Sequence, residues 1–262
     1  MNIDSISQFF IDKIGDKPIS IHLDFIGLLR LGKNNKQRLE NFREILLRIE
    51  EKGGTVLVPT YSMSYTKKEI YDIKYSPSEV GTVTEFLREK DYKKRTSDPL
   101  FSYLIYSKKD YSDFFKIKDF DCFGENSLVE SLYKDDAFLS TLGCGMRMLT
   151  EIYFLEKKIG NDYRYDKAFE GTTLSLLDEK IDTSGNYFCR NVDKYPNLLS
   201  NFITLQNDLT KNDIYEKWNY DDMFFMNVIS FKKLEDFILK KIKKNPLYLT
   251  IDRDLKHTLD KR

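Results

Sequence analysis

Apolar residues in the first sixty positions alternate between helical and extended spacing. Residues 36–52 carry an apolar side chain at each turn of one helical face, at Leu39, Phe42, Ile45, Leu46 and Ile49. This segment predicts an amphipathic helix that ends at Gly53, and a shorter helix is predicted over 5–14. The apolar segments 19–25 and 55–58 have the length of strands. Strand, helix and strand in this order form a βαβ-like unit, which predicts a layered α/β fold.

The same two patterns continue along the rest of the chain. The remaining strand-like segments are 103–106, 138–142, 163–169 and 186–190, the last two joined by a connection that suits a hairpin. The remaining helix-like segments are 124–133, 197–208, 231–244 and one that begins near Pro77 with Ser78 as its N-cap. The tail 253–262, with His257, is expected to be solvated. Nothing in this order requires a second domain, so a single domain over 1–262 is predicted.

Charge, the N-terminal segment and the cysteines limit the classes of partner, location and metal site that the sequence suggests. Lys and Arg together number 42, as do Asp and Glu, so the overall charge gives no reason to expect a nucleic-acid partner. The N-terminal segment has charges scattered among its apolar residues, which predicts a cytoplasmic protein with no membrane association. Cys122, Cys144 and Cys189 are widely spaced, which indicates neither a disulfide framework nor a zinc site, and no metal is expected.

Polar residues follow the strand 55–58 directly. Pro59 ends it, and Thr60, Tyr61 and Ser62 come next, at the strand's carboxyl end, where ligands usually bind in an open α/β sheet. From spacing alone, loop solvation of these hydroxyls is favoured over a ligand site, as is a surface charge for Arg88 and Arg95.

Three motifs in this region resemble those of a known family. Residues 54–60 read GTVLVPT, residues 77–88 read PSEVGTVTEFLR, and residues 95–102 read RTSDPLFS. In order and spacing they resemble the aminoglycoside 3-N-acetyltransferase family, also called the antibiotic N-acetyltransferase family. The resemblance implies a three-layer α/β/α fold with a central mixed sheet. It also implies acetyl-CoA or another acyl-CoA as co-substrate and direct acyl transfer to an amine, with a non-catalytic CoA-binding or partner-binding protein as the competing class.

The resemblance also assigns residues to roles. Strand 19–25 is similar to the family's V-H-x-S-L, with Asp24 in place of the usual Ser. The residues implied to bind the donor are His22, Asp24, Thr60, Tyr61, Ser62, Ser78, Thr84 and Arg88. Those implied on the acceptor side or its loop are Glu85, Arg95, Ser102 and Glu156. A packed core residue remains the alternative for His22, and a surface ion pair for Glu156.

The implied acceptor is an amino sugar. A nucleotide-linked amino sugar used for a surface glycan is the first choice, and an aminoglycoside is the second. The oligomeric state stays open, with a homodimer as one option.

The family pattern breaks at its histidine. The family has L-G-x-G and then T-x-x-H-x-x-E, whose His is taken as the general base. Here the glycines, Thr150 and Glu156 align, but Tyr153 stands in the position of that His. A histidine can accept the amine proton at neutral pH, whereas a tyrosine near pKa 10 is already protonated.

Three hypotheses follow from this change. In the first, Asp98, which replaces the His of the family's R-S-x-H-P, accepts the proton with Tyr153 as its partner, or instead marks a subgroup. In the second, Tyr153 is a general acid toward the departing thiolate. In the third, the site is degenerate and binds a CoA-like ligand without turnover, with Tyr153 simply a helix-face aromatic. A covalent acyl-enzyme at Cys144 is disfavoured because no histidine lies near it in sequence.

Overall fold

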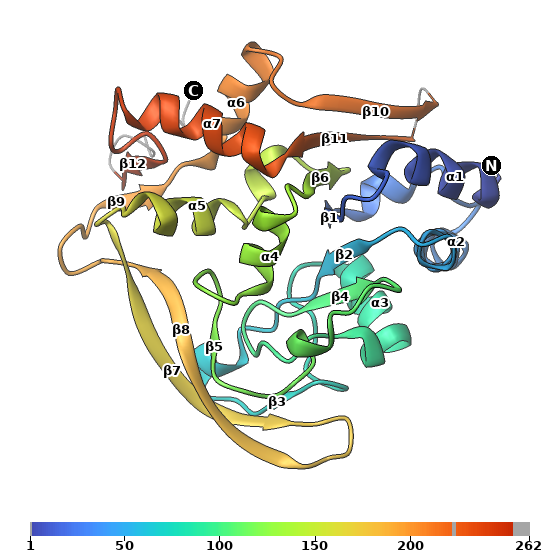
Figure 1. Cartoon of the computed structure of the whole chain (residues 1–262), viewed down its shortest axis with the longest axis horizontal. Helices are drawn as coiled ribbons and strands as arrows, with labels where there is room; N and C mark the ends of the chain where they lie inside the picture. Colours follow the sequence, from blue (N-terminus) through green and yellow to red (C-terminus); the bar gives the residue numbers. More distant parts are fainter. Residues whose placement is uncertain (1, 222–223, 254–262) are drawn as a thin grey trace.

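The computed structural model describes residues 2–221 and 224–253, and its centre is a six-stranded sheet in the order β10-β11-β6-β1-β2-β4 (Figure 1). Strands β1 (Ile19–Leu23), β2 (Val56–Pro59) and β6 (Phe138–Leu142) are parallel to one another. Strand β4 (Tyr103–Tyr106) pairs antiparallel with β2, and β11 (Phe224–Ser230) pairs antiparallel with β6 and with β10 (Glu216–Asp221). The sheet is therefore mixed, as predicted.

Helices cover both faces of this sheet. Helices α1 (Ile3–Ile14), α2 (Asn35–Glu51) and α3 (Thr82–Asp91) share a hydrophobic cluster with Val56 and Val58. Helices α4 (Leu128–Lys134), α5 (Ile152–Ile159), α6 (Phe202–Lys211) and α7 (Phe231–Ile242) share another with Leu57. Successive strand residues point to opposite faces, so β2 feeds both clusters. The predicted three-layer α/β/α class is confirmed.

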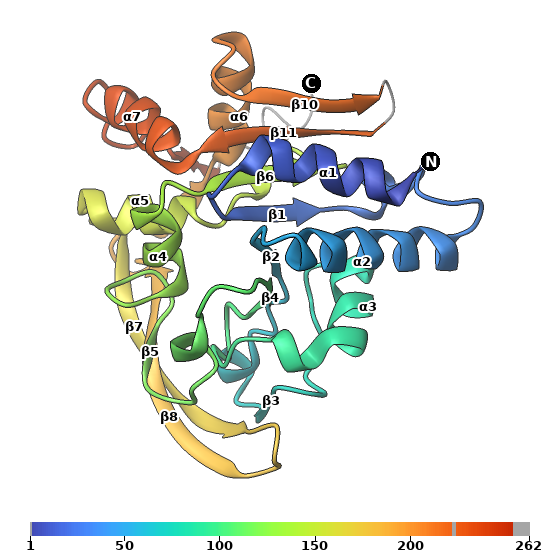
Figure 2. The same cartoon turned by 45° about the vertical axis from the view of Figure 1, so that its right-hand side comes forward.

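A long hairpin extends away from the central sheet (Figures 1 and 2). Strands β7 (Arg164–Leu174) and β8 (Lys180–Arg190) pair along their whole length, flanked by β3 (Tyr71–Asp72) and β5 (Phe120–Asp121). The strands are longer than predicted because Thr and Ile residues, which favour extended backbone, continue the pairing to the turn. The Tyr65 hydroxyl anchors the hairpin, lying 2.9 Å from Thr173 Oγ1 and 2.8 Å from Thr183 Oγ1.

Two expected boundaries are wrong. Helix α3 begins at Thr82 with Gly81 as its N-cap, not near Pro77. Ser78 instead donates its backbone N–H to Glu85 and pairs its hydroxyl with Thr84 at 2.8 Å, so the preceding segment folds back on the helix. Part of the segment 197–208 is a strand, β9 (Leu198–Ser200), which pairs with β12 (Thr250–Asp252). Strands β10 and β11 were not predicted either, and His257 lies outside the described residues.

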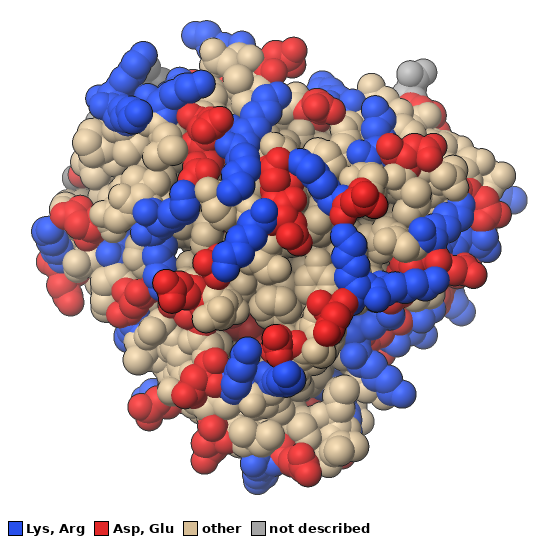
Figure 3. All heavy atoms as spheres, viewed as in Figure 1, with Lys and Arg blue, Asp and Glu red and all other residues tan. Residues whose placement is uncertain are grey.

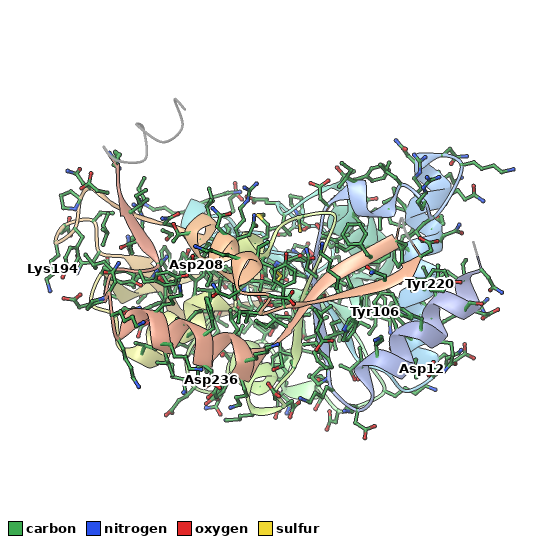
Figure 4. All side chains as sticks on the ribbon, turned by 90° about the horizontal axis from the view of Figure 1, so that it is seen from above. Asp12, Tyr106, Lys194, Asp208, Tyr220 and Asp236 are labelled. Carbon is green, nitrogen blue, oxygen red and sulfur yellow. The ribbon has the colours of Figure 1, made fainter. Side chains whose placement is uncertain are left out.

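Short 3₁₀ helices fill the connections, namely Phe25–Leu28, Ser64–Lys67, Tyr92–Lys94, Ser112–Phe114 and Met146–Met148. Seen from above, Tyr220 on β10 lies beside α1 (Figure 4), where its ring centroid is 5.8 Å from that of Phe9. Basic and acidic side chains are interspersed over the face shown in Figure 3, which therefore carries no broad patch of one sign. In the described part of the chain, no helix combines the length and hydropathy needed to cross a membrane.

Candidate active site

The candidate site lies at the carboxyl ends of the parallel strands. Because β1, β2 and β6 are parallel, their carboxyl ends meet at one edge of the sheet, and antiparallel β4 begins there, with Tyr103 opposite Pro59. His22 lies near the end of β1, opposite Thr141 of β6. The segment after β6 returns to the same edge and places Glu151 just before α5.

His22 and Glu151 form a buried pair at this edge. His22 Nε2 lies 2.8 Å from Glu151 Oε2 and 3.1 Å from Oε1, and Ser20 Oγ donates to Oε1 at 2.6 Å. Only 7% of His22 and none of Glu151 is exposed. Burial alone would raise the pKa of Glu151, but attraction to His22 and hydrogen bonds from His22 and Ser20 outweigh it and lower that pKa. Glu151 is therefore an ionised carboxylate at neutral pH.

A chain of hydroxyls leads to the same carboxylate. Tyr61 donates to the Tyr103 hydroxyl at 2.7 Å, and Tyr103 donates to Glu151 Oε1 over a longer 3.4 Å. The Tyr61 oxygen also lies 2.5 Å from Thr150 Oγ1. Burial, reinforced by the charge of Glu151, raises the pKa of both tyrosines well above 10. Both hydroxyls therefore stay protonated and act as donors.

A cavity of about 140 Å³, here the histidine cavity, opens beside this pair. Its lining consists of His22, Leu23, Asp24, Pro59, Tyr61, Val80, Thr84, Cys144, Met148 and Thr150. Four of the residues predicted to bind the donor thus meet here, namely His22, Asp24, Tyr61 and Thr84. Asp24 is exposed, and its carboxylate also accepts the backbone N–H of Ile26 at 3.1 Å.

A second hollow of about 530 Å³, here the arginine hollow, adjoins the histidine cavity at Cys144. It is lined by Ile26, Gly27, Thr141, Gly143, Cys144, Gly145, Arg147, Phe225 and Asn227. The segments after β1 and β6 touch backbone to backbone here. A Cβ on Gly143, whose φ is +74°, would lie 2.3 Å from Gly27 N, so only glycine fits.

Other predicted residues are enclosed in the fold. Arg95 donates to Thr60 O at 2.6 Å and to Ser102 Oγ at 3.1 Å, and its guanidinium lies 5.0 Å from the centre of the Tyr71 ring. Ser62 donates to Pro99 O at 2.8 Å. These contacts favour a role for Arg95 and Ser102 in holding the loop, one of the two roles expected for them.

Arg88 and Glu85, both on helix α3, form an ion pair with each other. Arg88 Nη2 donates to Glu85 Oε1 at 2.7 Å, and Arg88 Nε donates to Oε2 at 2.9 Å. Arg88 also donates to the carbonyl of Lys74. Both charges are thus engaged inside the protein, and neither residue lines the histidine cavity.

Asp98 lies at a different cavity. This acidic cavity, of about 440 Å³, shares the wall residue Tyr103 with the hydroxyl chain, and its charged lining residues are Asp98, Asp113, Asp119, Asp121, Glu125 and Lys118. Asp98 Oδ1 accepts the backbone N–H groups of Leu100 at 2.8 Å and Phe101 at 2.9 Å. Burial raises the pKa of Asp98.

Tyr153 lies in an aromatic cluster. Its ring centroid is 5.4 Å from that of Phe123 and 5.6 Å from that of Phe202, and the Arg164 guanidinium lies 4.3 Å from its centre. Burial raises the pKa of Tyr153. No contact between Tyr153 and Asp98 is found among the described residues, and Tyr153 lines neither the histidine cavity nor the acidic one.

Glu156 is fully buried rather than a surface residue. Its Oε2 lies 2.8 Å from Arg164 Nε, and its Oε1 accepts the Tyr163 hydroxyl at 2.8 Å. The expected alternative of a surface ion pair is wrong because Arg164, from β7, supplies the partner inside the fold. Cys144 is a thiol, since burial raises its pKa to about 11, so the structure offers no thiolate for an acyl-enzyme.

Sequence reasoning missed Glu151 and Tyr103. Glu151 lies at a position that the family pattern leaves variable, and Tyr103 reads as one more aromatic strand residue. The signal for Glu151 was a carboxylate directly before a helix, in the segment that departs from the family pattern.

Comparisons with known proteins show the family to which the chain belongs. The family model for aminoglycoside 3-N-acetyltransferases matches residues 28–237. The chain belongs to the aminoglycoside 3-N-acetyltransferase family. The members of this family are N-acetyltransferases that use acetyl-CoA. No curated protein sequence matches the chain.

Several solved structures share the fold. A sisomicin-bound AAC-VIa has a TM-score of 0.69 at 12% identity, over 93% of this chain and 98% of that one. AAC-IIIb in a binary complex with CoASH has a TM-score of 0.66 at 14% identity, over 93% and 97%. YokD from Bacillus subtilis has a TM-score of 0.62 at 14% identity, over 94% and 100%. At these identities the likeness establishes the fold alone.

No metal centre accompanies the site in the region that the structure describes, because no three His, Cys, Asp or Glu side chains there are grouped to hold an ion. The chain's cysteines are all free.

Proposed function

We propose that this family member transfers an acetyl group from acetyl-CoA to an amino group of an amino sugar. The observation that carries the proposal is that the histidine cavity and the arginine hollow share the wall residue Cys144 at the carboxyl ends of the parallel strands. The histidine cavity, about 140 Å³, has room for the thioester and the reacting amine only. The arginine hollow, about 530 Å³, can take the extended body of a donor such as CoA.

The lining of the arginine hollow suits the donor. Arg147 is exposed, and it is the only cationic side chain among the described residues that line this hollow. A guanidinium binds phosphate oxygens in pairs, so Arg147 would hold the phosphate end of CoA. The glycines at 143 and 145 let Gly27 and Gln206 pack closely against this wall of the hollow.

Carboxylates near the site favour a cationic acceptor. Asp24 is exposed at the histidine cavity, and the acidic cavity beyond Tyr103 has five carboxylates and one lysine in its lining. Amino sugars with several ammonium groups would be attracted to this side of the protein. Of the two acceptors expected from the sequence, this lining favours an aminoglycoside, because the phosphates of a nucleotide-linked amino sugar for a surface glycan would be repelled by the carboxylates.

The experiment is a thiol-release assay with purified protein and acetyl-CoA. The acceptor panel contains simple amino sugars, nucleotide-linked amino sugars and aminoglycosides, and each is paired with its N-acetylated form, which lacks the reacting amine. The proposal predicts release with at least one free amine and not with its N-acetylated partner, together with a product heavier by one acetyl group. Release that does not depend on any amine would contradict it.

A matched pair of variants tests the donor site. Arg147→Gln is expected to raise the KM for acetyl-CoA about tenfold or more, because a charge-assisted contact to phosphate is lost. Lys244→Gln, an exposed residue after α7, removes the same charge elsewhere and is expected to leave that KM unchanged. Equal effects of the two variants would place the donor outside the arginine hollow.

One observation favours a second candidate, a CoA-binding protein without turnover. Tyr153, in the position of the family's histidine, is packed among aromatic rings and cannot accept a proton while its pKa is raised. Calorimetry with CoA separates the two candidates. Binding without acceptor-dependent release for the whole panel would favour the second.

A further inference from the structure

Amide formation needs a group that accepts a proton from the amine. Neither residue first considered is well placed for this. Asp98 uses Oδ1 to hold the backbone N–H groups of Leu100 and Phe101, and it lines the acidic cavity rather than the histidine cavity. Tyr153 packs edge-to-face against Phe123 and at a tilt against Phe202. The site has the chemistry of the family's reaction but lacks the base at its usual position.

His22 has the geometry that the other two lack. A carboxylate can only accept hydrogen bonds, so the 2.8 Å contact with Glu151 puts the proton of neutral His22 on Nε2. Nδ1 then carries the lone pair. Nδ1 makes no hydrogen bond within the described part of the chain, and it is not one of the side-chain atoms enclosed there without a partner. Nδ1 is therefore not sealed inside the protein, and His22 lines the histidine cavity.

The surroundings of Glu151 hold this pair in place. Ser20, on β1, donates its hydroxyl to Oε1 at 2.6 Å, and Tyr103, on β4, donates to the same oxygen at 3.4 Å. A packed core histidine needs no fully buried carboxylate, and burying one costs free energy unless it is well bonded. A carboxylate that orients a histidine through its far nitrogen is a recurrent device for proton transfer.

We propose that His22 is the general base of acetyl transfer and that Glu151 is its positioning residue; this inference rests on the proposed function. The amine nitrogen attacks the thioester carbonyl carbon, forming the C–N bond, and its proton moves to His22 Nδ1. The C–S bond then breaks, and the proton passes from His22 to the departing thiolate. The products are the amide and CoA as a thiol, with no other reactant consumed.

Titratable groups from several elements surround His22. They are Glu151 before α5, Asp24 after β1, Tyr61 after β2 and Cys144 after β6, with Tyr103 of β4 behind Glu151. Glu151 is ionised, whereas the two tyrosines and the cysteine are neutral. Only the unprotonated imidazole of His22 can serve as the base, because a protonated imidazole cannot accept the amine proton.

The test compares His22→Gln with His257→Gln, which makes the same change at the other histidine of the chain. His22→Gln is expected to lower kcat by about 10² to 10⁴ while the Kd for CoA changes less than about threefold. It should also change the acid limb of the kcat/KM profile that the wild type and His257→Gln share, leaving only the part set by protonation of the acceptor amine. If His22→Gln fails to fold, His22→Ala is used, and imidazole added to the buffer is expected to restore part of its rate.

The outcomes are distinct. A kcat within about threefold of the wild type, or a loss that appears wholly in the Kd for CoA, overturns the role of His22 but leaves the proposed function standing. An acid limb in His22→Gln that is identical to that of the wild type, or His22→Ala that imidazole does not rescue, also overturns that role. A wild-type protein with no acceptor-dependent thiol release overturns both.

Discussion

Glu151 Oε2 lies 2.8 Å from His22 Nε2, although the two residues are 129 positions apart and Glu151 has no exposed surface. The two meet because the parallel strands β1 and β6 end at one edge, and the segment after β6 turns back across it. This contact holds His22 through Nε2 by a fully buried carboxylate.

The first prediction concerns stability against pH. The pKa of Glu151 is lowered on folding from its ordinary value of 4.5, so its stabilising contribution is present above about pH 4.5 and is lost as pH falls through the lower folded value. Glu151→Gln is expected to cost about 1–3 kcal/mol in urea unfolding at pH 7, because a charge-assisted pair is lost. The cost should shrink below about pH 4.5.

The control for this prediction is Glu69→Gln, which changes an exposed carboxyl in the same way. It is expected to alter the unfolding free energy by less than about 0.5 kcal/mol at either pH. A cost for Glu151→Gln that stays constant from pH 7 to pH 3 would show that Glu151 is not the ionised partner of His22.

The second prediction concerns Asp98. Asp98→Asn keeps an oxygen to accept the N–H groups of Leu100 and Phe101 and removes only the charge. The fold should therefore be retained, the acceptor KM should rise several-fold, and kcat should stay within about threefold, since the acidic cavity attracts the acceptor but holds no base. Steady-state kinetics measure this. A loss of kcat by 10² or more in a folded variant would return the role of base to Asp98.

The third prediction concerns Tyr153. Tyr153→Phe keeps the ring between Phe123 and Phe202, so it is expected to leave both kcat and the melting temperature nearly unchanged. Tyr153→His should not raise the rate, because the Arg164 guanidinium lies 4.3 Å from the ring centre and position 153 does not line the histidine cavity. A marked rate loss in the Phe variant would instead support Tyr153 as general acid.

The fourth prediction concerns Glu156 and Arg164. Glu156→Gln leaves the buried Arg164 guanidinium without its charge partner and is expected to cost about 3–5 kcal/mol in urea unfolding. The double change Glu156→Leu with Arg164→Met removes both charges and should cost clearly less than the single one. A double variant as unstable as the sum of its singles would mean that the two residues do not act as a pair.

Local patterns predicted much of the layered core. The apolar faces of α2 and α7 and the strand 103–106 can be recognised from residues close in sequence. Strands β10 and β11 could not, because only Trp218 is buried in exposed β10 and the pairing partner of β11 lies near residue 140. The hairpin strands were underestimated since threonines suit both strands and loops.

The candidate site was predictable only where its residues belong to motifs that are local in sequence. Motif spacing brought His22, Asp24, Tyr61 and Thr84 to attention, and they do line one cavity. The partner of His22 depends on where a distant segment returns, which no local pattern encodes. Arg95 and Glu156 look like ligand-binding charges in sequence, but the packing of Thr60, Ser102 and Arg164 around them turns them inward.

The most direct measurement is a crystal structure of the protein with CoA and an amine acceptor found in the thiol-release panel. The account predicts the CoA sulfur in the histidine cavity, within proton-transfer reach of His22 Nδ1, with the phosphates toward Arg147 and the acceptor amine beside the sulfur. A CoA sulfur seated in the acidic cavity next to Asp98, or against Tyr153, would contradict it.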